Sequence, residues 1–364
     1  MYDAAVPPRI ADAAVPLPAA MAALVEEAAA EIARFDGEMG MDIAPFAAVL
    51  LRTESAASSK IENLTASAKA IAVAELGHHG SGNARQVVAN VRTMTAALGL
   101  ADQIDASTIL EMHAVLLGTE RPEIAGKWRE EQVWIGGGDY GPHGATFVPP
   151  HQGRVGAAIA DLVAFIGRDD IPVLAHAAIA HAQFETIHPF PDGNGRTGRA
   201  LLHAHLRHKG LTRNVTVPVS AGLLVETEAY FTALTAYRSG DPAPIVERLA
   251  HASFAAVGNG RQLVSELREV RHGWQSRIRA RRGAAAWGIV DLLLRHPVVN
   301  RHLVASELGI AGSNVYRSLE PLVAAGVLVE FTDRRRDQMW SAPEILNALD
   351  EFAARTGRRT RAAR

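Results

Sequence analysis

Residues 188–199 read His-Pro-Phe-Pro-Asp-Gly-Asn-Gly-Arg-Thr-Gly-Arg, which places a base, a carboxylate, a glycine-rich turn and two arginines close together. Glycines let backbone N–H groups approach an anion closely. The Ala/Leu-rich run after Gly198 predicts a helix whose N-terminus faces the same anion. Arg196 and Arg199 are three positions apart, so on a helix both guanidinium groups lie near one face and can bind phosphate oxygens. The stretch therefore predicts a polyphosphate site.

Two other phosphate motifs are excluded by the surrounding sequence. The glycines satisfy G-x-G-x-x-G, but the dinucleotide-binding motif needs a strand before them and an acid about 20 residues after them. The preceding segment 171–187 instead has apolar residues at helical spacing, and position 218 is Pro218. A Walker A loop is absent because no Gly-Lys-Ser/Thr follows. A plain turn capped by His188 and Asp192 would explain single residues but not the whole stretch.

The stretch resembles the signature of the Fic family, H-P-F-x-[D/E]-G-N-G-R-x-x-R, at every specified position. Members transfer a nucleoside monophosphate, usually AMP from ATP, to a protein hydroxyl. The resemblance implies a mainly α fold, in which a Fic-type helical bundle carries a β-hairpin flap. It also implies a nucleotidyltransferase, a protein adenylyltransferase that releases diphosphate. Relatives that phosphorylate their targets carry Lys where this chain has Gly195, so the glycine favours AMP transfer.

The resemblance implies a role for each position of the stretch. His188 would deprotonate a target Tyr, Thr or Ser hydroxyl, which attacks the α-phosphate of ATP, and Asp192 would hold Mg²⁺ between the α- and β-phosphates. Phe190 would be a buried anchor. The remaining positions would bind nucleotide: the amides of Gly193, Asn194 and Gly195 as an anion hole, Arg196 at the leaving diphosphate, Arg199 at the γ-phosphate, and Thr197 and Gly198 beside them.

General chemistry agrees with these roles. A histidine with an ordinary pKa near ~6.5 is mostly neutral at pH 7 and can accept a proton. Mg²⁺ prefers one or two carboxylates together with phosphate oxygens. Phosphoryl-type transfer depends on positioning and charge neutralisation, so a site without a Cys or Ser nucleophile is adequate.

Upstream, Gln132–Ile135 and Ala145–Val148 are two short β-rich runs that flank a Gly-rich turn, which predicts a hairpin. Taken alone, this is an ordinary surface hairpin. Beside the signature it resembles the Fic flap, whose exposed edge pairs with the extended target segment.

A third match to the Fic family lies before the flap and the signature in the sequence. Ser58-Ser59-Lys60-Ile61-Glu62-Asn63 fits [S/T]-x-x-x-E-[G/N], an inhibitory motif of one Fic class. Ser58 and Glu62 are i and i+4 and share a helix face. The resemblance implies that Glu62, in a segment with Ser59 and Asn63, pairs with Arg199 and occupies the γ-phosphate position.

Other candidate residues carry weaker signals. His176 and His181 have spacings that do not put them on one face with His188, so we expect packed or capping histidines. Val217–Tyr237 reads as a helix from the region that partly builds the adenine pocket in Fic proteins, with Glu226 and Tyr230 as candidate nucleotide contacts.

The composition limits the class of protein and the kinds of site that the chain can form. The chain has 364 residues, 48% of them hydrophobic, a net charge of −2 and no cysteine. These values support real hydrophobic cores, exclude disulfides and thiolate chemistry, and argue against bulk nucleic-acid binding. No signal peptide is evident and no apolar run approaches the ~18 residues of a membrane span, so we expect a cytoplasmic protein without membrane contact.

The C-terminal part has a pattern of its own. Helices are expected at 284–295, 301–308 and 313–325, followed by a hairpin at 327–341 with Arg334, Arg335 and Arg336 at its tip. This arrangement resembles a winged helix-turn-helix domain. Its recognition helix would present Ser313, Asn314, Tyr316 and Arg317, while Pro321 implies a kink or an early end.

The expected organisation follows in chain order. It comprises an N-terminal helical region with the inhibitory helix 58–63 (1–104), a Fic core with flap 132–148 and signature 188–199 (105–258), an Arg-rich linker helix (259–283), a winged helix (284–350) and a basic tail (351–364).

Three functions remain open at this stage. The first is AMP transfer to a protein, or to the chain itself, restrained by the pairing of Glu62 with Arg199. The second is the reverse reaction, in which Glu62 positions water to release AMP from a modified protein. The third is a nucleotide-sensing DNA-binding regulator, against which the presence of His188 argues. The partners expected are a target protein along the flap and ATP with Mg²⁺. DNA at the winged helix and a second copy of the chain stay open.

Overall fold

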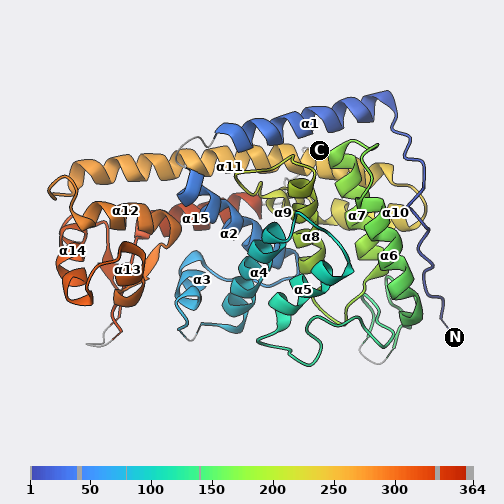
Figure 1. Cartoon of the computed structure of the whole chain (residues 1–364), viewed down its shortest axis with the longest axis horizontal. Coiled ribbons are helices and arrows are strands. Elements are labelled where there is room, and N and C mark those ends of the chain that lie inside the picture. Colours follow the sequence, from blue (N-terminus) through green and yellow to red (C-terminus); the bar gives the residue numbers. More distant parts are fainter. Residues whose placement is uncertain (1, 39–42, 79, 139–140, 333–336, 358–364) are drawn as a thin grey trace, which may run out of the picture.

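The computed structural model describes residues 2–38, 43–78, 80–138, 141–332 and 337–357, and these residues form a mainly helical molecule (Figure 1). The helices are α1 (Ala19–Glu38), α2 (Ile43–Ile61), α3 (Ala68–Glu75), α4 (Gly82–Gly99), α5 (Ala106–Leu117), α6 (Val155–Ile166), α7 (Val173–Ile187), α8 (Asn194–His208), α9 (Val219–Val225), α10 (Thr227–Arg238), α11 (Ala243–Arg277), α12 (Ala285–Arg295), α13 (Arg301–Leu308), α14 (Gly312–Ala324) and α15 (Pro343–Thr356). The strands are β1 (Val298–Asn300), β2 (Val329–Glu330) and β3 (Met339–Ser341), in the antiparallel order β1-β3-β2.

Helices α7 and α8 form the centre of the molecule. All of α7 from Leu174 to Ile187 is buried, and α6, α8, α10, α11 and α1 pack around it. Small side chains allow this close packing. A methyl group on Gly198 of α8 would lie only 2.8 Å from the Phe184 ring and from the Glu185 carboxylate. Burial of apolar surface on every side therefore positions the helix pair that carries the signature.

The turn between these helices depends on left-handed backbone. His188 caps α7 at φ 49°, and Gly193 precedes α8 at φ 75°. Glycine adopts this conformation freely, whereas a histidine there is uncommon and is held by its surroundings. Helix α8 begins at Asn194, earlier than the Ala/Leu-rich run alone indicated, so both signature arginines belong to its first two turns.

The long helix α11 corrects the expected linker. It is continuous from Ala243 to Arg277, so residues 259–277 extend a helix that begins inside the expected core. In Figure 1 α11 runs along the molecule, with α1 beside it and α12–α14 at one end. Gly260 lies where a methyl group would meet the Phe35 ring at 2.9 Å, and buried Leu263, Leu267 and Trp274 continue the apolar face.

The described C-terminal residues match the expected elements with two differences. Helix α14 continues through Pro321 to Ala324, because its apolar face, including Leu319 and Leu322, is buried. The expected basic tail begins later, since Pro343–Thr356 is helix α15 with buried Ile345, Leu349 and Phe352. Arg334, Arg335 and Arg336 lie outside the described residues.

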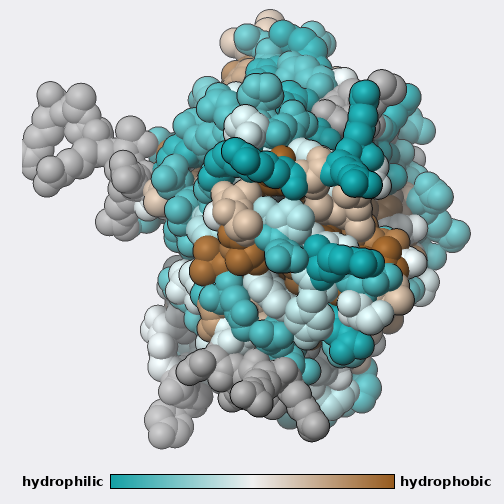
Figure 2. All heavy atoms as spheres, turned by 90° about the vertical axis from the view of Figure 1, so that its left-hand side faces the viewer, coloured by the Kyte–Doolittle hydropathy of each residue, from teal (hydrophilic) through white to brown (hydrophobic). Residues whose placement is uncertain are grey.

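The surface of this end is mostly hydrophilic with a few apolar patches (Figure 2). Ser313, Asn314, Tyr316 and Arg317 of α14 are exposed. DNA binding by this face stays a prediction. None of the helices in the described ranges has the length and apolar character needed to cross a bilayer.

Candidate active site

The loop between α7 and α8 is held by a stack of aromatic rings. Phe190 is fully buried, and its ring stacks on His113 at 3.7 Å between centroids and on Trp128 at 5.0 Å. The Gly126 N–H donates to His113 Nδ1 at 3.0 Å, so the ring proton sits on Nε2, which donates to the Asp192 carbonyl at 3.0 Å. Burial lowers the His113 pKa to about 4, which keeps this neutral tautomer at pH 7.

Asn194 closes the same loop with its side chain. Its Oδ1 accepts from the Phe190 N–H at 2.9 Å, and its Nδ2 donates to the Phe190 carbonyl at 2.8 Å. Both backbone groups of a buried loop residue are thereby satisfied, which a loop cannot achieve with backbone partners alone. The amide side chain of Asn194 thus shapes the turn.

His188 stands at the end of α7. Burial lowers its pKa to about 4, with a further lowering by the Arg238 charge, so the imidazole is neutral at pH 7. The Arg129 guanidinium donates from Nε to the His188 carbonyl at 2.9 Å and also donates to the Pro150 carbonyl. Arg129 therefore ties the backbone of the histidine to the end of the flap. A neutral imidazole can accept a proton, as a general base must.

The N-terminus of α8 gathers charged groups around Asp192. The Asp192 carboxylate accepts from the Gly193 N–H at 2.6 Å and lies 3.9 Å from Arg196 and 4.0 Å from Arg121. Asp192 and Arg196 line a pocket of about 550 Å³ together with Gly82, Arg85, Gln86, Leu117, Thr119, Glu120 and Arg121. Three arginines beside a helix N-terminus make this pocket suitable for an anion.

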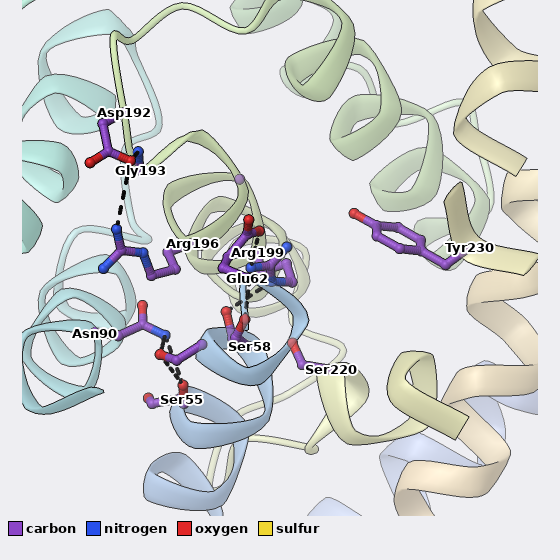
Figure 3. Close-up of polar contacts among 12 residues, drawn as sticks. Ser55, Ser58, Glu62, Asn90, Asp192, Gly193, Arg196, Arg199, Ser220 and Tyr230 are labelled. Carbon is purple, nitrogen blue, oxygen red and sulfur yellow. Dashed lines mark hydrogen bonds and ion pairs between the residues drawn. The ribbon is translucent and has the colours of Figure 1, made fainter. Parts of the chain in front are cut away.

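The second signature arginine binds the segment expected to be inhibitory (Figure 3). Arg199 is 1% exposed and donates from Nε to Ser58 Oγ at 2.8 Å and from Nη2 to the Ser58 carbonyl at 2.9 Å. Nη2 also lies 2.9 Å from Glu62 Oε1. The contact expected from the sequence between Glu62 and Arg199 is therefore present.

The Glu62 carboxylate leaves no room beside it on α8. A methyl group on Gly195 would lie 2.0 Å from Glu62 Oε1, so a side chain at this position is incompatible with the observed contact. The carboxylate lies at the N-terminal turn of α8, where a negative charge is favourable. Asn63 follows at φ 60°, a left-handed conformation that Asn and Gly tolerate best, which explains the last position of the motif.

The helix that carries this segment is held by buried polar contacts. The Glu54 carboxylate of α2, fully buried, lies 2.8 Å from His203 Nε2 of α8, 2.8 Å from the Ser220 N–H, and also accepts from the Ser220 hydroxyl. Asn90 of α4 donates from Nδ2 to the Ser55 carbonyl at 2.9 Å and to Ser59 Oγ at 3.2 Å. Three different elements thus fix the register of α2.

The remaining predicted residues fall into two groups. Thr197 is buried, Gly198 packs against Phe184 and Glu185 of α7, and Tyr230 is buried with its hydroxyl 2.8 Å from His181 Nε2. Glu226 instead pairs with Arg248, away from these contacts. The expected single helix at 217–237 is two helices, because the backbone breaks at Glu226 (φ −139°, ψ 63°).

The histidines upstream of the signature are packed in the core. His181 Nδ1 faces the Gly198 carbonyl at 3.2 Å, and His176 Nε2 faces the Phe165 carbonyl at 2.7 Å. Burial lowers the pKa of both rings.

The expected flap is less regular than a two-stranded hairpin. A single antiparallel bridge joins Ile135 and Phe147. Thr146 and Phe147 both donate to the Ile135 carbonyl, at 2.7 and 3.2 Å, and Gly136 and Gly137 turn at positive φ. Prolines follow directly at 149 and 150 and cannot donate. The two β-rich runs at 132–135 and 145–148 therefore meet as expected, through one antiparallel bridge.

The N-terminal segment lies along the outer edge of this flap. The Ala5 N–H donates to the Val148 carbonyl at 2.9 Å. Phe147 directs its own N–H and carbonyl toward Ile135, so the neighbouring Val148 directs its groups outward. The segment is anchored farther on, where the Pro8 carbonyl accepts from Gln183 at 2.8 Å and the Ile10 N–H donates to Asp161 at 2.7 Å.

Several residues at the site lay outside the sequence-based predictions, besides those that line the pocket or hold α2. His113 and Arg129 support the loop, and Glu185 and Arg238 lie close to His188 and Arg199. Burial raises the pKa of Glu185 to about 7. Arg238 stacks on the flap residue Phe147 at 3.8 Å. The sequence positions of Arg129 and Glu185 do not indicate what these residues contact, because their partners are distant in the chain.

Comparison with known proteins identifies this arrangement. Residues 103–206 match the model of the Fic/DOC family. This segment is a Fic domain. It includes the pocket-lining helix α5, the flap, the whole signature loop and nearly all of α8. The inhibitory segment and the C-terminal helices lie outside the matched residues.

Curated relatives resemble the Fic domain and its flanks. The chain is 35% identical over 160 residues to a protein named protein adenylyltransferase fic-1 from Caenorhabditis elegans, covering 43% of this chain and 28% of the relative. It is 29% identical over 163 residues to protein adenylyltransferase Fic from Drosophila erecta, covering 44% of this chain and 30% of that protein. The chain thus spans under a third of the length of these relatives.

The likeness in fold extends beyond the Fic domain. A crystal structure of a Fic family protein from Desulfovibrio desulfuricans superposes with a TM-score of 0.56 at 23% identity, covering 90% of this chain and 97% of that one. The arrangement of the flanking helices around the Fic domain is therefore shared with a solved structure.

Proposed function

We propose that this chain transfers AMP from ATP to a hydroxyl side chain of a protein, and that Glu62 restrains the reaction by holding Arg199. The observation that carries the proposal is the pairing at the N-terminus of α8. There a buried arginine of the signature is bound by a carboxylate that a phosphate would have to replace. The names of the curated relatives support the same activity.

The chain's own residues supply most of the chemistry. His188 is neutral at pH 7 and accepts the proton of the attacking hydroxyl. Arg196 and Arg199 neutralise the charge of the phosphates, and the amides at the start of α8 bind an oxyanion. Asp192 has a half-exposed carboxylate in the pocket, which fits one protein ligand for Mg²⁺ with phosphate oxygens completing the shell.

Target binding is proposed at the flap. An extended segment can add to the outer edge at Val148, which at present accepts from Ala5 of the chain itself. Strand addition selects weakly for sequence, so the alignment of a hydroxyl with His188 would decide which residue is modified.

The test is transfer of label from the α-phosphate of ATP in the presence of Mg²⁺. The intact protein, Glu62→Gly and Glu62→Gly/His188→Ala are compared. We expect strong labelling of a protein only in the single variant, and at least a 10²-fold loss in the double variant. ATP binding should be equal in both variants, because His188 has no phosphate-binding role in the proposal.

Two results would reject the proposed function. Equal labelling with and without His188 would show that His188 is not the base. Absence of label in Glu62→Gly, with ATP bound, would show that the chain does not transfer AMP.

A further inference from the structure

The C-terminal helix α15 contacts the chain on both sides of Glu62. Lys60, two residues before Glu62, donates from Nζ to the Ala353 carbonyl at 3.1 Å. Ala68, the first residue of α3, donates its N–H to Asp350 Oδ1 at 2.9 Å. The segment between these contacts contains Glu62, so α15 fixes both of its ends.

The contact with Asp350 provides a partner for a backbone N–H group at the start of α3. The first N–H groups of a helix have no partner within it, and Asp350 accepts one of them at the N-terminus of α3. A carboxylate at this end also interacts favourably with the helix dipole. The Ser67 side chain accepts a hydrogen bond from another of these N–H groups, that of Ala70, at 3.2 Å. The start of α3 thus depends on a residue from the far end of the chain.

Apolar packing at this junction leaves a gap. A cavity of about 120 Å³ lies between α2, α3 and α15, lined by Ala57, Ile71, Leu349 and Phe352 among others. Side chains next to an open cavity lose part of their packing energy. The hydrogen bonds of Lys60 and Asp350 therefore hold α15 to the segment beside a gap in the apolar packing.

Helix α15 is itself attached firmly to α11. Near its start, Glu344 accepts from the Trp274 indole at 3.1 Å and from Arg277 at 2.6 Å. Near its end, Arg355 pairs with Glu266 at 2.9 Å. Strand β3 leads directly into the helix. The position of α15 is therefore set by α11 and by the C-terminal sheet.

We propose that α15 braces the inhibitory segment, with Asp350 and Lys60 as positioning residues that keep Glu62 on Arg199. This inference rests on the proposed function and names its regulation. The Glu62 side chain is 42% exposed, and the chain reverses at Asn63, so the carboxylate is well placed to leave when either end of the segment loosens. A displacement of the C-terminal helices then releases the transfer reaction.

The test uses full-length Asp350→Ala with Glu351→Ala as a matched control, since Glu351 is the adjacent exposed acid on the same helix. We expect severalfold more labelling from α-labelled ATP in Asp350→Ala than in the intact protein, and no change in the control. Lys60→Met should act in the same direction. In a Glu62→Gly background Asp350→Ala should add nothing, because the carboxylate that it positions is gone.

Hydrogen exchange of residues 59–66 gives a second readout that needs no activity. We expect faster exchange in Asp350→Ala than in the control. Unchanged exchange and unchanged labelling, with Glu62→Gly active, would overturn the brace while leaving the proposed function intact. Equal stimulation by Asp350→Ala with and without Glu62 would overturn it as well. An inactive Glu62→Gly variant would reject the proposed function, and exchange alone would then decide whether α15 holds the segment.

Discussion

The signature loop and the inhibitory segment meet at Arg199 but are held in opposite ways. The loop is fixed by a fully buried Phe190 between aromatic rings and by the side chain of Asn194. The inhibitory segment ends in a half-exposed carboxylate whose surroundings are polar. Apolar burial resists displacement, whereas solvent screens the attraction of an ion pair whose carboxylate is 42% exposed. From this difference we expect that the contact between Glu62 and Arg199 can open while the signature loop stays in place.

The largest expected effect tests the rigidity of the loop. Phe190→Ala should lower the free energy of unfolding by about 3–5 kcal/mol, because it leaves a cavity between His113 and Trp128. Urea unfolding followed by tryptophan fluorescence measures the loss. Phe231→Ala, at a side chain that is 49% exposed, serves as the control and should change stability by less than about 0.5 kcal/mol. Similar losses in both variants would contradict the comparison.

The protonation state of His188, the proposed base, tests the same comparison. Because burial lowers the pKa of His188 to about 4, its ring should stay neutral as the pH falls from 7 to 5 and take up a proton only near pH 4. An NMR titration of histidine ring nitrogens, assigned with His188→Ala, measures this. Since the unfolded chain binds this proton near pH ~6.5, stability should fall as pH drops from 6.5 toward 4. A midpoint near 6.5 in the folded protein would show an exposed, mobile ring.

The inhibitory contact should be energetically weak. Glu62→Gln keeps the shape of the side chain and removes its charge, and the pair is partly exposed to solvent. We expect a change of less than about 1 kcal/mol in the free energy of unfolding, together with increased labelling from ATP. Denaturation and labelling are measured on the same preparation. A loss as large as that of Phe190→Ala would show that Glu62 is a structural residue.

The smallest effect concerns the flap edge. Ala5→Pro removes the N–H that donates to Val148, whereas Ala4→Pro keeps it. A hydrogen bond of this kind contributes about 0.5–1.5 kcal/mol to stability, and its loss should affect mainly the neighbouring residues. Hydrogen exchange of residues 2–12 should become faster in Ala5→Pro alone. Equal exchange in the two variants would show that the N-terminal segment is held only by its later contacts, such as Ile10 with Asp161.

Local patterns predicted a large part of the fold. Helix α13 was expected at its observed bounds, and α7 and α12 were expected nearly so, because apolar residues at helical spacing bury one face. The two runs of the flap meet in an antiparallel bridge between Ile135 and Phe147, where Thr146 and Phe147 both donate to the Ile135 carbonyl. The expected tail was wrong at residues 351–356, because the apolar face of α15, with buried Leu349 and Phe352, was not recognised.

The sequence by itself determined the chemistry of the site, since base, carboxylate, glycines and arginines stand within one short loop and its helix. It also indicated Glu62 as the partner of Arg199, because the resemblance to the Fic family implies that pairing. Only the tertiary structure decided what holds these groups. His113, Arg129 and Asp350 come from distant parts of the chain, and each acts through a contact whose sequence separation leaves no local pattern. Side-chain chemistry is a property of the residue, whereas its position depends on long-range packing.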